Sequence, residues 1–130
     1  MFAGKRPANL GVSSGRLVPC KRTPNCVSSQ ADPVDAEHYI APIAFRGDAM
    51  TALRKLMHAM ERVSVVREAS DYLQAEFRSK LMGFVDDVEF YYDKAAGLIH
   101  VRSASRLGRR DFGVNRKRIE EIRRLIQDQR

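Results

Sequence analysis

Polar and hydrophobic residues alternate along the middle of the chain, and this pattern predicts four β-strands. Residues 72–77 and 84–92 alternate over most of their length, and residues 99–105 resume the alternation after a turn. A β-branched run at residues 63–66 precedes them. A period of two residues is that of a strand with one buried face. We therefore expect two hairpins that form a four-stranded antiparallel sheet.

Two flanking stretches repeat hydrophobic residues at helical spacing instead. Residues 48–60 begin with Asp48 and residues 115–127 begin with Asn115, and both residue types are good helix N-caps. An amphipathic helix buries its apolar stripe well against the apolar face of a sheet. The predicted fold class is α+β, in the order α-β-β-β-β-α, with both helices on one face. The two apolar stripes comprise Leu53, Leu56, Met57 and Met60, and Ile119, Ile122, Leu125 and Ile126.

A long N-terminal arm precedes this core. Residues 1–47 hold all five prolines and four of the eight glycines, which favours irregular structure. Hydrophobic residues nevertheless recur along the arm, so we expect it to wrap the domain rather than to hang free. We predict a flexible N-terminus at residues 1–14 and a single domain at residues 15–130. That domain comprises a wrapping arm (15–47) and an α+β core (48–130).

The alternation also favours a register for the second hairpin. Pairing Phe90 with Ile99 keeps the apolar residues of both strands on the covered face. Asp86 then faces Ser103 on the covered face, and opposite charges meet on the open face. The remaining predicted pairs are Val88 with Val101, Phe84 with Ser105, Asp87 with Arg102 and Glu89 with His100.

Positive charge is concentrated toward the end of the chain. The net charge is +7, and residues 102–130 hold 10 Lys and Arg residues against 4 Asp and Glu residues. Seven of these cations lie in residues 102–118, around the predicted junction of the last strand and the last helix. Such a surplus attracts anions or acidic partners. No stretch approaches the ~18 apolar residues of a membrane-spanning helix. No apolar run follows the basic N-terminus as in a secretory signal, so we expect a cytoplasmic protein.

Three cations occupy the first turn of the final helix, where the helix dipole is already positive. They are Arg116, Lys117 and Arg118, and a negative group should offset them. One kind of companion is internal, a network of aspartates and arginines that pins the helix to the sheet. The other is an external phosphate, carboxylate or acidic partner, bound by N–H groups of residues 113–115 and by arginines. The internal pairs would join Asp86, Asp87 and Asp111 to Arg102, Arg106 and Arg118.

The cysteines and histidines do not indicate a metal site. Cys20 and Cys26 are two ligands where a zinc site needs four, and the three histidines are scattered. A disulfide between the two cysteines is geometrically possible, but the cytosol keeps thiols reduced. We therefore expect buried free thiols and no metal or other cofactor.

Four blocks of the chain resemble the family of domains of unknown function numbered 1499. Pro-Cys at 19–20 precedes Thr-Pro-Asn-Cys-Val-Ser-Ser at 23–29, and further blocks follow at 85–90, 102–108 and 111–119. The resemblance extends from Gly15 onward and is strongest to short bacterial members without a membrane anchor. It implies no particular activity, but it suggests that the arm and the Arg/Ser/Asp cluster meet in one polar pocket. The matching positions are Cys20, Asn25, Cys26, Ser28, Ser29, Asp86, Asp87, Arg102, Ser103, Ser105, Arg106, Asp111, Asn115 and Arg118.

These observations favour a binding protein without chemistry of its own. The candidate ligand is a small anion or an acidic partner, held at the Arg/Ser/Asp pocket. One alternative is a hydrolase-like or transferase-like enzyme that uses Ser103 with Asp86, although no complete set of base and orienting group is visible. Another alternative is nucleic-acid binding through the basic C-terminal helix, against which stands the lack of interleaved aromatic residues. The oligomeric state is not indicated.

Overall fold

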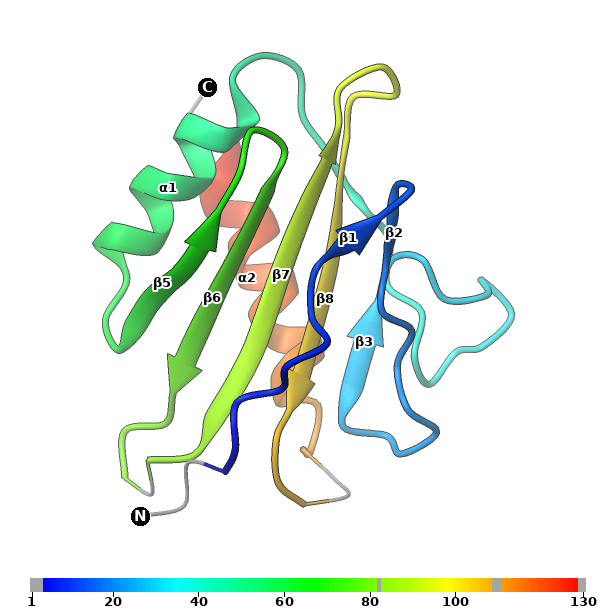
Figure 1. Cartoon of the computed structure of the whole chain (residues 1–130), viewed down its shortest axis with the longest axis vertical. Helices are drawn as coiled ribbons and strands as arrows, with labels where there is room; N and C mark the ends of the chain where they lie inside the picture. Colours follow the sequence, from blue (N-terminus) through cyan, green and yellow to red (C-terminus); the bar gives the residue numbers. More distant parts are fainter. Residues whose placement is uncertain (1–3, 82, 109–110, 129–130) are drawn as a thin grey trace.

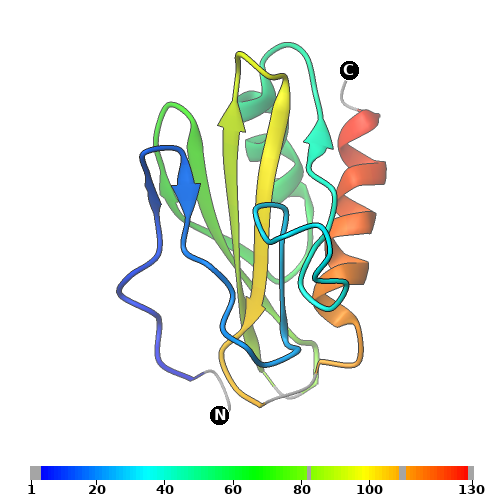
Figure 2. The same cartoon turned by 90° about the vertical axis from the view of Figure 1, so that its right-hand side faces the viewer.

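The computed structural model describes residues 4–81, 83–108 and 111–128. It has two layers, a twisted antiparallel sheet with both helices on one face (Figures 1 and 2). The α+β class with two helices agrees with the prediction. In the described part of the chain, no helix is both long enough and apolar enough to cross a bilayer.

The sheet has six strands, so the prediction of four strands is wrong. Four of them are those that the alternation predicts. The two extra strands, one of three residues and one of two, pair with the last of these four. A period of two cannot be recognised over so few residues, which is why the arm read as irregular. The order is β3 (Cys26–Ser28), β8 (Leu98–Ser105), β7 (Val85–Asp93), β6 (Tyr72–Arg78) and β5 (Val63–Glu68), with β4 (Ile43–Ala44) also on β8. A separate hairpin comprises β1 (Val12–Ser13) and β2 (Arg16–Leu17).

The register of the β7–β8 hairpin differs from the predicted one by two residues. Phe90 lies opposite Val101 rather than Ile99, and Asp86 lies opposite Ser105 rather than Ser103. The predicted pairs on the open face are wrong too. Asp87 faces Ala104, Glu89 faces Arg102 and His100 faces Tyr91. A shift of two residues keeps every side chain on the same face, so the hydrophobic pattern cannot detect it.

Helix α1 (Ala49–Ala59) begins as predicted, and helix α2 (Val114–Gln127) does not. Asp48 caps α1 by accepting a hydrogen bond from the backbone N–H of Thr51. The N-cap of α2 is Gly113, with φ of 79°, and Asn115 is already inside the helix. Asp111 does the capping instead, because its carboxylate accepts hydrogen bonds from the N–H groups of Gly113 and Asn115.

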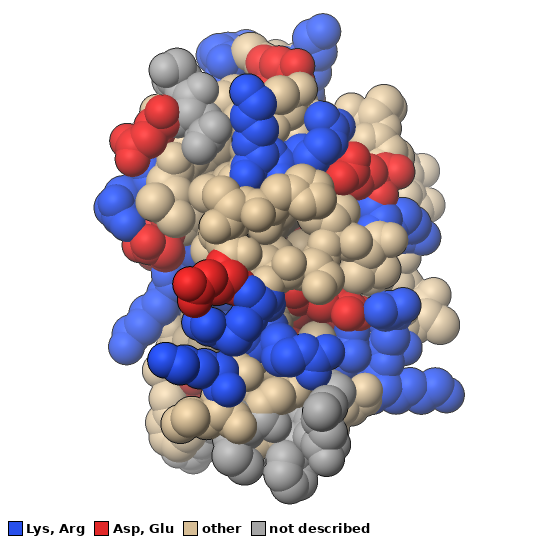
Figure 3. All heavy atoms as spheres, turned by 90° about the vertical axis from the view of Figure 1, so that its left-hand side faces the viewer, with Lys and Arg blue, Asp and Glu red and all other residues tan. Residues whose placement is uncertain are grey.

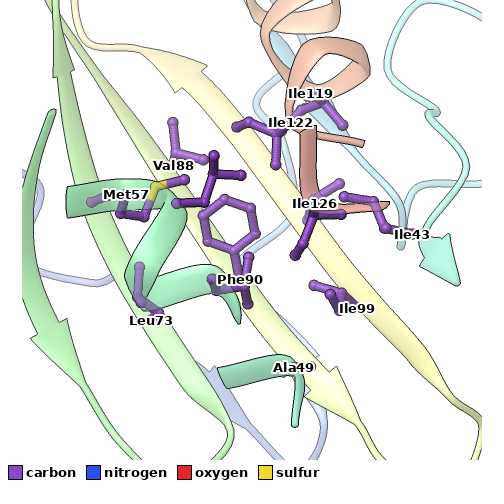
Figure 4. Close-up of a cluster of buried hydrophobic side chains, with 14 of the residues drawn as sticks. Ile43, Ala49, Met57, Leu73, Val88, Phe90, Ile99, Ile119, Ile122 and Ile126 are labelled. Atoms are coloured by element: carbon purple, nitrogen blue, oxygen red, sulfur yellow. The ribbon is translucent and has the colours of Figure 1, made fainter. Parts of the chain in front are cut away.

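The hydrophobic core lies between the helices and the sheet (Figure 4). Phe90 is fully buried at its centre, and the apolar stripes of both helices face it, although Leu125 and Met60 are only partly buried. The opposite face of the sheet carries a second, polar layer. The N-terminal segment lies in front of it (Figure 1), and the backbone N–H of Gly11 donates to Glu89 there at 2.9 Å. Of the N-terminus predicted to be flexible, residues 1–3 lie outside the described residues.

Candidate functional site

The predicted Arg/Ser/Asp residues lie on both faces of the sheet. Adjacent residues of a strand point to opposite faces, so Asp86 faces the helices and Asp87 faces away. We call the first group the helix-face cluster and the second the open-face cluster. The helix-face cluster comprises Asp86, Ser103, Ser105, Asp111, Asn115 and Arg118. The open-face cluster comprises Glu76, Asp87, Glu89, Arg102 and Arg106.

Asn115 is the centre of the helix-face cluster and is fully buried. Its Oδ1 accepts hydrogen bonds from Ser103 Oγ (2.5 Å) and Arg118 Nη1 (2.8 Å). Its Nδ2 donates to Ser105 Oγ (2.9 Å) and to the Asp111 carboxylate (2.8 Å). All the hydrogen-bonding atoms of this amide are therefore engaged, as a buried polar group requires.

Arg118 has an internal counter-ion. Its Nη2 lies 2.8 Å from Asp86 Oδ2, and its guanidinium stacks over the ring of Phe77 at 4.9 Å from the ring centroid. Ser103 beside it is fully buried, and its hydroxyl is engaged by both Asn115 and Arg118. The helix-face cluster thus fastens α2 to the sheet and has no accessible nucleophile at Ser103.

The open-face cluster is paired as well. Arg106 forms a fork with Asp87, through Nε and Nη2 at 2.8 Å each, and also contacts Glu76. Glu76 accepts a further bond from Arg6 of the N-terminal segment. The hydrogen bond from Arg6, together with Arg106, holds the pKa of the Glu76 carboxyl below its ordinary value despite partial burial.

Glu89 and Arg102 form the most deeply buried part of the open-face cluster. Arg102 Nη1 lies 3.7 Å from Glu89 Oε1. The other carboxylate oxygen of Glu89 accepts hydrogen bonds from Tyr72 Oη (2.6 Å) and from Gly11 N. Burial raises the pKa of the Glu89 carboxyl and also lowers the pKa of Arg102. A carboxylate therefore stands opposite each of the guanidinium groups of Arg102, Arg106 and Arg118.

The arm is closed by a disulfide, so the expectation of free thiols is wrong. Cys20 and Cys26 are bonded, with an S–S distance of 2.05 Å and Cα atoms 5.7 Å apart. Cys26 is fixed by β3, where it lies opposite Ala104, and the chain of residues 20–26 loops back to meet it. A reducing cytosol disfavours disulfides in general, but it does not determine whether the fold brings the sulfur atoms of Cys20 and Cys26 together.

Asn25 ties this loop to the helix-face cluster. Its Nδ2 donates to the carbonyl of Gly108 (2.6 Å). Its own carbonyl accepts hydrogen bonds from Ser105 N (2.9 Å) and Asn115 Nδ2 (3.2 Å). The arm and the cluster therefore meet at Asn25 through hydrogen bonds. Beside this contact lies a hollow of about 530 Å³, lined by Pro24, Val27, Glu37, Asp111, Phe112, Gly113 and Arg116.

Another hollow lies beside the disulfide loop. A cavity of about 390 Å³ lies there, which we call the arm cavity. It contains three cations, Arg16, Lys21 and Arg22, that sequence reasoning did not single out. None of these three forms an ion pair with a carboxylate of the described residues. Its lining is Arg16, Leu17, Pro19, Cys20, Lys21, Arg22, Ser28, Gln30, Ala31, Asp32, Asp35 and His38.

The two aspartates of the arm cavity already have internal roles. Asp35 binds His38 Nδ1 at 2.8 Å, and Asp32 accepts a bond from the backbone N–H of Val34. His38 Nε2 lies 2.9 Å from the carbonyl of Thr23, so both ring nitrogens face acceptors. Burial lowers the pKa of His38, but the Thr23 carbonyl and the Asp35 carboxylate outweigh burial and leave it above its ordinary value.

Ser29 and His100 form a further pair that the sequence did not suggest. Ser29 Oγ lies 3.0 Å from His100 Nδ1, and it also accepts a hydrogen bond from the N–H of Val101. Burial lowers the pKa of His100 and favours its neutral form. The serine hydroxyl thus fastens the arm to β8, and its partner lies 71 positions away in the chain, beyond any local signal.

A family model described as "Protein of unknown function (DUF1499)" matches residues 16–126. The chain belongs to the DUF1499 family. The match confirms the resemblance of the four sequence blocks, and it includes the disulfide, both clusters and all residues of the arm cavity. No curated protein and no solved structure matches the chain. Any account of this DUF1499 domain's function must therefore begin from the geometry of its own residues.

Proposed function

We propose that this protein binds a small anionic ligand in the arm cavity. The observation that carries the proposal is the presence of Arg16, Lys21 and Arg22 around one hollow, where none of them forms an ion pair with a carboxylate of the described residues. Three cations stand against Asp32 and Asp35, and Asp35 is already bound to His38, so the hollow has a positive balance. The summed field of such a concave surface concentrates anions. The arginine side chains can in addition grip a carboxylate or phosphate by two parallel hydrogen bonds.

The arm cavity suits an anion better than the Arg/Ser/Asp residues that the sequence favoured. In the two Arg/Ser/Asp clusters, Arg106 binds Asp87 and Arg118 binds Asp86. An anion that entered either cluster would have to displace one of these carboxylates. Of the predicted arm residues, Cys20 and Ser28 line the cavity, while Asn25 and Ser29 hold its walls in place. We assign the two clusters the role of positioning the arm.

The size of the arm cavity limits the ligand. Its volume of about 390 Å³ is at the small end of the range for small-molecule sites, which is roughly 300–1,000 Å³. Leu17 and Pro19 supply an apolar side. A small phosphate or carboxylate compound with an apolar portion fits this lining.

The structure lends little support to the two alternative functions. Ser103 is fully buried, and Asp86 lies opposite Ser105 and is bound to Arg118 rather than to Ser103. Along α2, Arg123 and Arg124 pair with Glu120 and Glu121, which reduces the charge that a nucleic acid would meet.

The disulfide bears on the compartment. Disulfides persist in oxidising compartments and are rare in the cytosol. The Cys20–Cys26 bond therefore favours an oxidising location over the cytoplasm that we expected from the sequence.

Thermal stabilisation by inorganic phosphate and by citrate tests the proposed ligand class. We expect the melting temperature of the full chain to rise with the concentration of at least one of these anions at constant ionic strength. The double variant Lys21→Ala/Arg22→Ala should reduce the apparent affinity by about tenfold, an order of magnitude typical of charge-assisted contacts. The matched control is Lys55→Ala/Lys94→Ala, which removes the same number of exposed cations elsewhere. The proposal is contradicted if the double variant and the control lose affinity equally. It is also contradicted if neither anion raises the melting temperature of the wild type.

A further inference from the structure

Large hydrophobic side chains are exposed mainly at one end of the molecule. The described parts of the β6–β7 connection (79–81 and 83–84) and of the β8–α2 connection (106–108 and 111–113) lie at the lower end in Figures 1 and 2, together with the start of the described chain. We call this the loop end. Leu81 is 90% exposed and Phe112 is 87% exposed there. Of the six large hydrophobic residues exposed in the described chain, the five at the loop end or beside it are Leu81, Phe84, Leu107, Phe112 and Val114.

Such clustering calls for an explanation. Single exposed hydrophobic residues are normal on soluble proteins, but a group of them marks an interaction surface. Hydrogen bonds hold described residues next to the two most exposed of these side chains, Leu81 and Phe112. Ser79 and Phe84 close the first loop by hydrogen bonds, and Asp111 caps α2 beside Phe112. Phe112 has φ of 53°, an unfavourable conformation for a bulky residue that holds its ring away from the core.

The same end is basic. Lys5, Lys80 and Lys117 are exposed at the loop end, and none of them forms an ion pair with a described carboxylate. The two connections contain a single acidic residue, Asp111, whose carboxylate is engaged by backbone N–H groups and by Asn115. Toward the lower end of the face in Figure 3, Lys and Arg are the most frequent charged side chains, whereas both signs mix higher up.

We propose that the loop end docks on the surface of an anionic lipid bilayer. Apolar side chains on projecting loops can enter the boundary between headgroups and acyl chains, while flanking lysines remain among anionic headgroups. The exposed side chains come from separate connections, and Phe112 also lines a hollow of about 530 Å³ beside the arm. The lysines at the loop end complement a broad surface of anionic headgroups, which favours a bilayer. This inference is independent of the arm cavity, because none of the loop-end residues lines that cavity.

Tryptophan fluorescence tests this inference directly, because the chain contains no tryptophan. Phe112→Trp places a single reporter at the loop end, and Val34→Trp places one at an equally exposed position in the arm. We expect vesicles of phosphatidylcholine with phosphatidylglycerol to shift the emission of the Phe112→Trp protein to shorter wavelength. The Val34→Trp protein should show no shift. Shifts in both proteins, or in neither, overturn the proposal.

Vesicle co-sedimentation separates insertion from simple charge attraction. Leu81→Ser/Phe112→Ser leaves the net charge unchanged and should weaken binding to the same vesicles by about tenfold or more. Val34→Ser is the matched control, and circular dichroism checks that each variant is folded. Lys80→Glu should also weaken binding more than Lys94→Glu. Lys94 belongs to the β7–β8 turn, which lies at the upper end of the sheet in Figure 1. If Leu81→Ser/Phe112→Ser binds as well as wild type, or instead abolishes self-association seen by ultracentrifugation, the loop end is not a lipid-docking surface.

Discussion

The helix-face cluster and the arm cavity both contain arginine, but they differ in what stands opposite it. In the helix-face cluster, Arg118 is largely buried and faces Asp86, and every hydrogen-bonding atom of the Asn115 amide is engaged. In the arm cavity, Arg16 and its neighbouring cations line an open hollow and are free of ion pairs with the described carboxylates. The comparison shows that the density of charge along a sequence does not locate a binding site. The partner of each charge decides whether it holds the fold together or is available to a ligand.

Removal of Arg118 should have the largest effect on stability. Arg118→Ala leaves Asp86 as a charge in a largely buried position without its counter-ion, and it also removes a donor to Asn115. We expect the free energy of unfolding to fall by about 3–5 kcal/mol, the range for breaking a buried ion pair. Urea denaturation of wild type and variant measures the difference.

Two further variants make this result specific. Arg124→Ala removes a cation from the same helix that forms an exposed pair with Glu121, and it should cost less than about 1 kcal/mol. Asp86→Asn/Arg118→Met should recover part of the loss, because no unpaired charge remains. A loss from Arg118→Ala no larger than that from Arg124→Ala would show that the cluster does not hold the helix.

The helix-face cluster could be predicted in part from the sequence. The positive end of the helix dipole predicted a negatively charged partner for Arg118. The alternation of polar and hydrophobic residues placed Asp86 on the helix-facing side of the sheet. The structure has both features. The predicted pairing of Phe90 with Ile99 is wrong by two residues, because Asp93 pairs with Leu98 around a four-residue turn. Gly97 ends that turn with φ of 67°, and no hydrophobic pattern reports such a turn.

Reduction of the disulfide should have the second largest effect, on the arm. A cross-link around a loop of about this length stabilises the folded state by roughly 2 kcal/mol, because it restricts the unfolded chain. We expect Cys20→Ser/Cys26→Ser to lose about this amount and to unfold identically with and without a dithiol reductant. Thiol titration of the unfolded, unreduced wild type should detect no free thiol. Two titratable thiols would contradict the bond.

The arm cavity was not predictable from the sequence. Lys21 and Arg22 lie within the loop that the disulfide closes, while Arg16 reaches the same hollow from β2. Their proximity depends on the pairing of β3 with β8 and on the path of residues 29–42, and both result from contacts between distant parts of the chain. The one local signal was a group of cations on either side of Pro19 and Cys20.

The stabilising effect of His38 should depend on pH. Its folded pKa is raised, so its contribution is fully present below the ordinary histidine pKa of about 6.5 and is lost as pH rises through the folded value. The difference in unfolding free energy between wild type and His38→Gln should therefore shrink from mildly acidic to mildly alkaline pH. His100 has the opposite dependence because its pKa is lowered, but it is common to both proteins and cancels in the difference.

A His38→Gln difference that stays constant, or grows toward alkaline pH, would contradict the assignment of His38 as a charged donor to Asp35 and Thr23.

The smallest effect on stability should come from Arg16, which bears most directly on the proposed function. Within the described part of the chain, its guanidinium donates a single long hydrogen bond, 3.3 Å, to the carbonyl of Gln30, and the residue is exposed. Arg16→Ala should change the unfolding free energy by less than about 0.5 kcal/mol, as surface substitutions usually do. The same variant should weaken the stabilisation by phosphate or citrate severalfold. If Arg118→Met weakens anion binding and Arg16→Ala does not, the ligand site lies at the helix-face cluster and the assignment of the two regions is reversed.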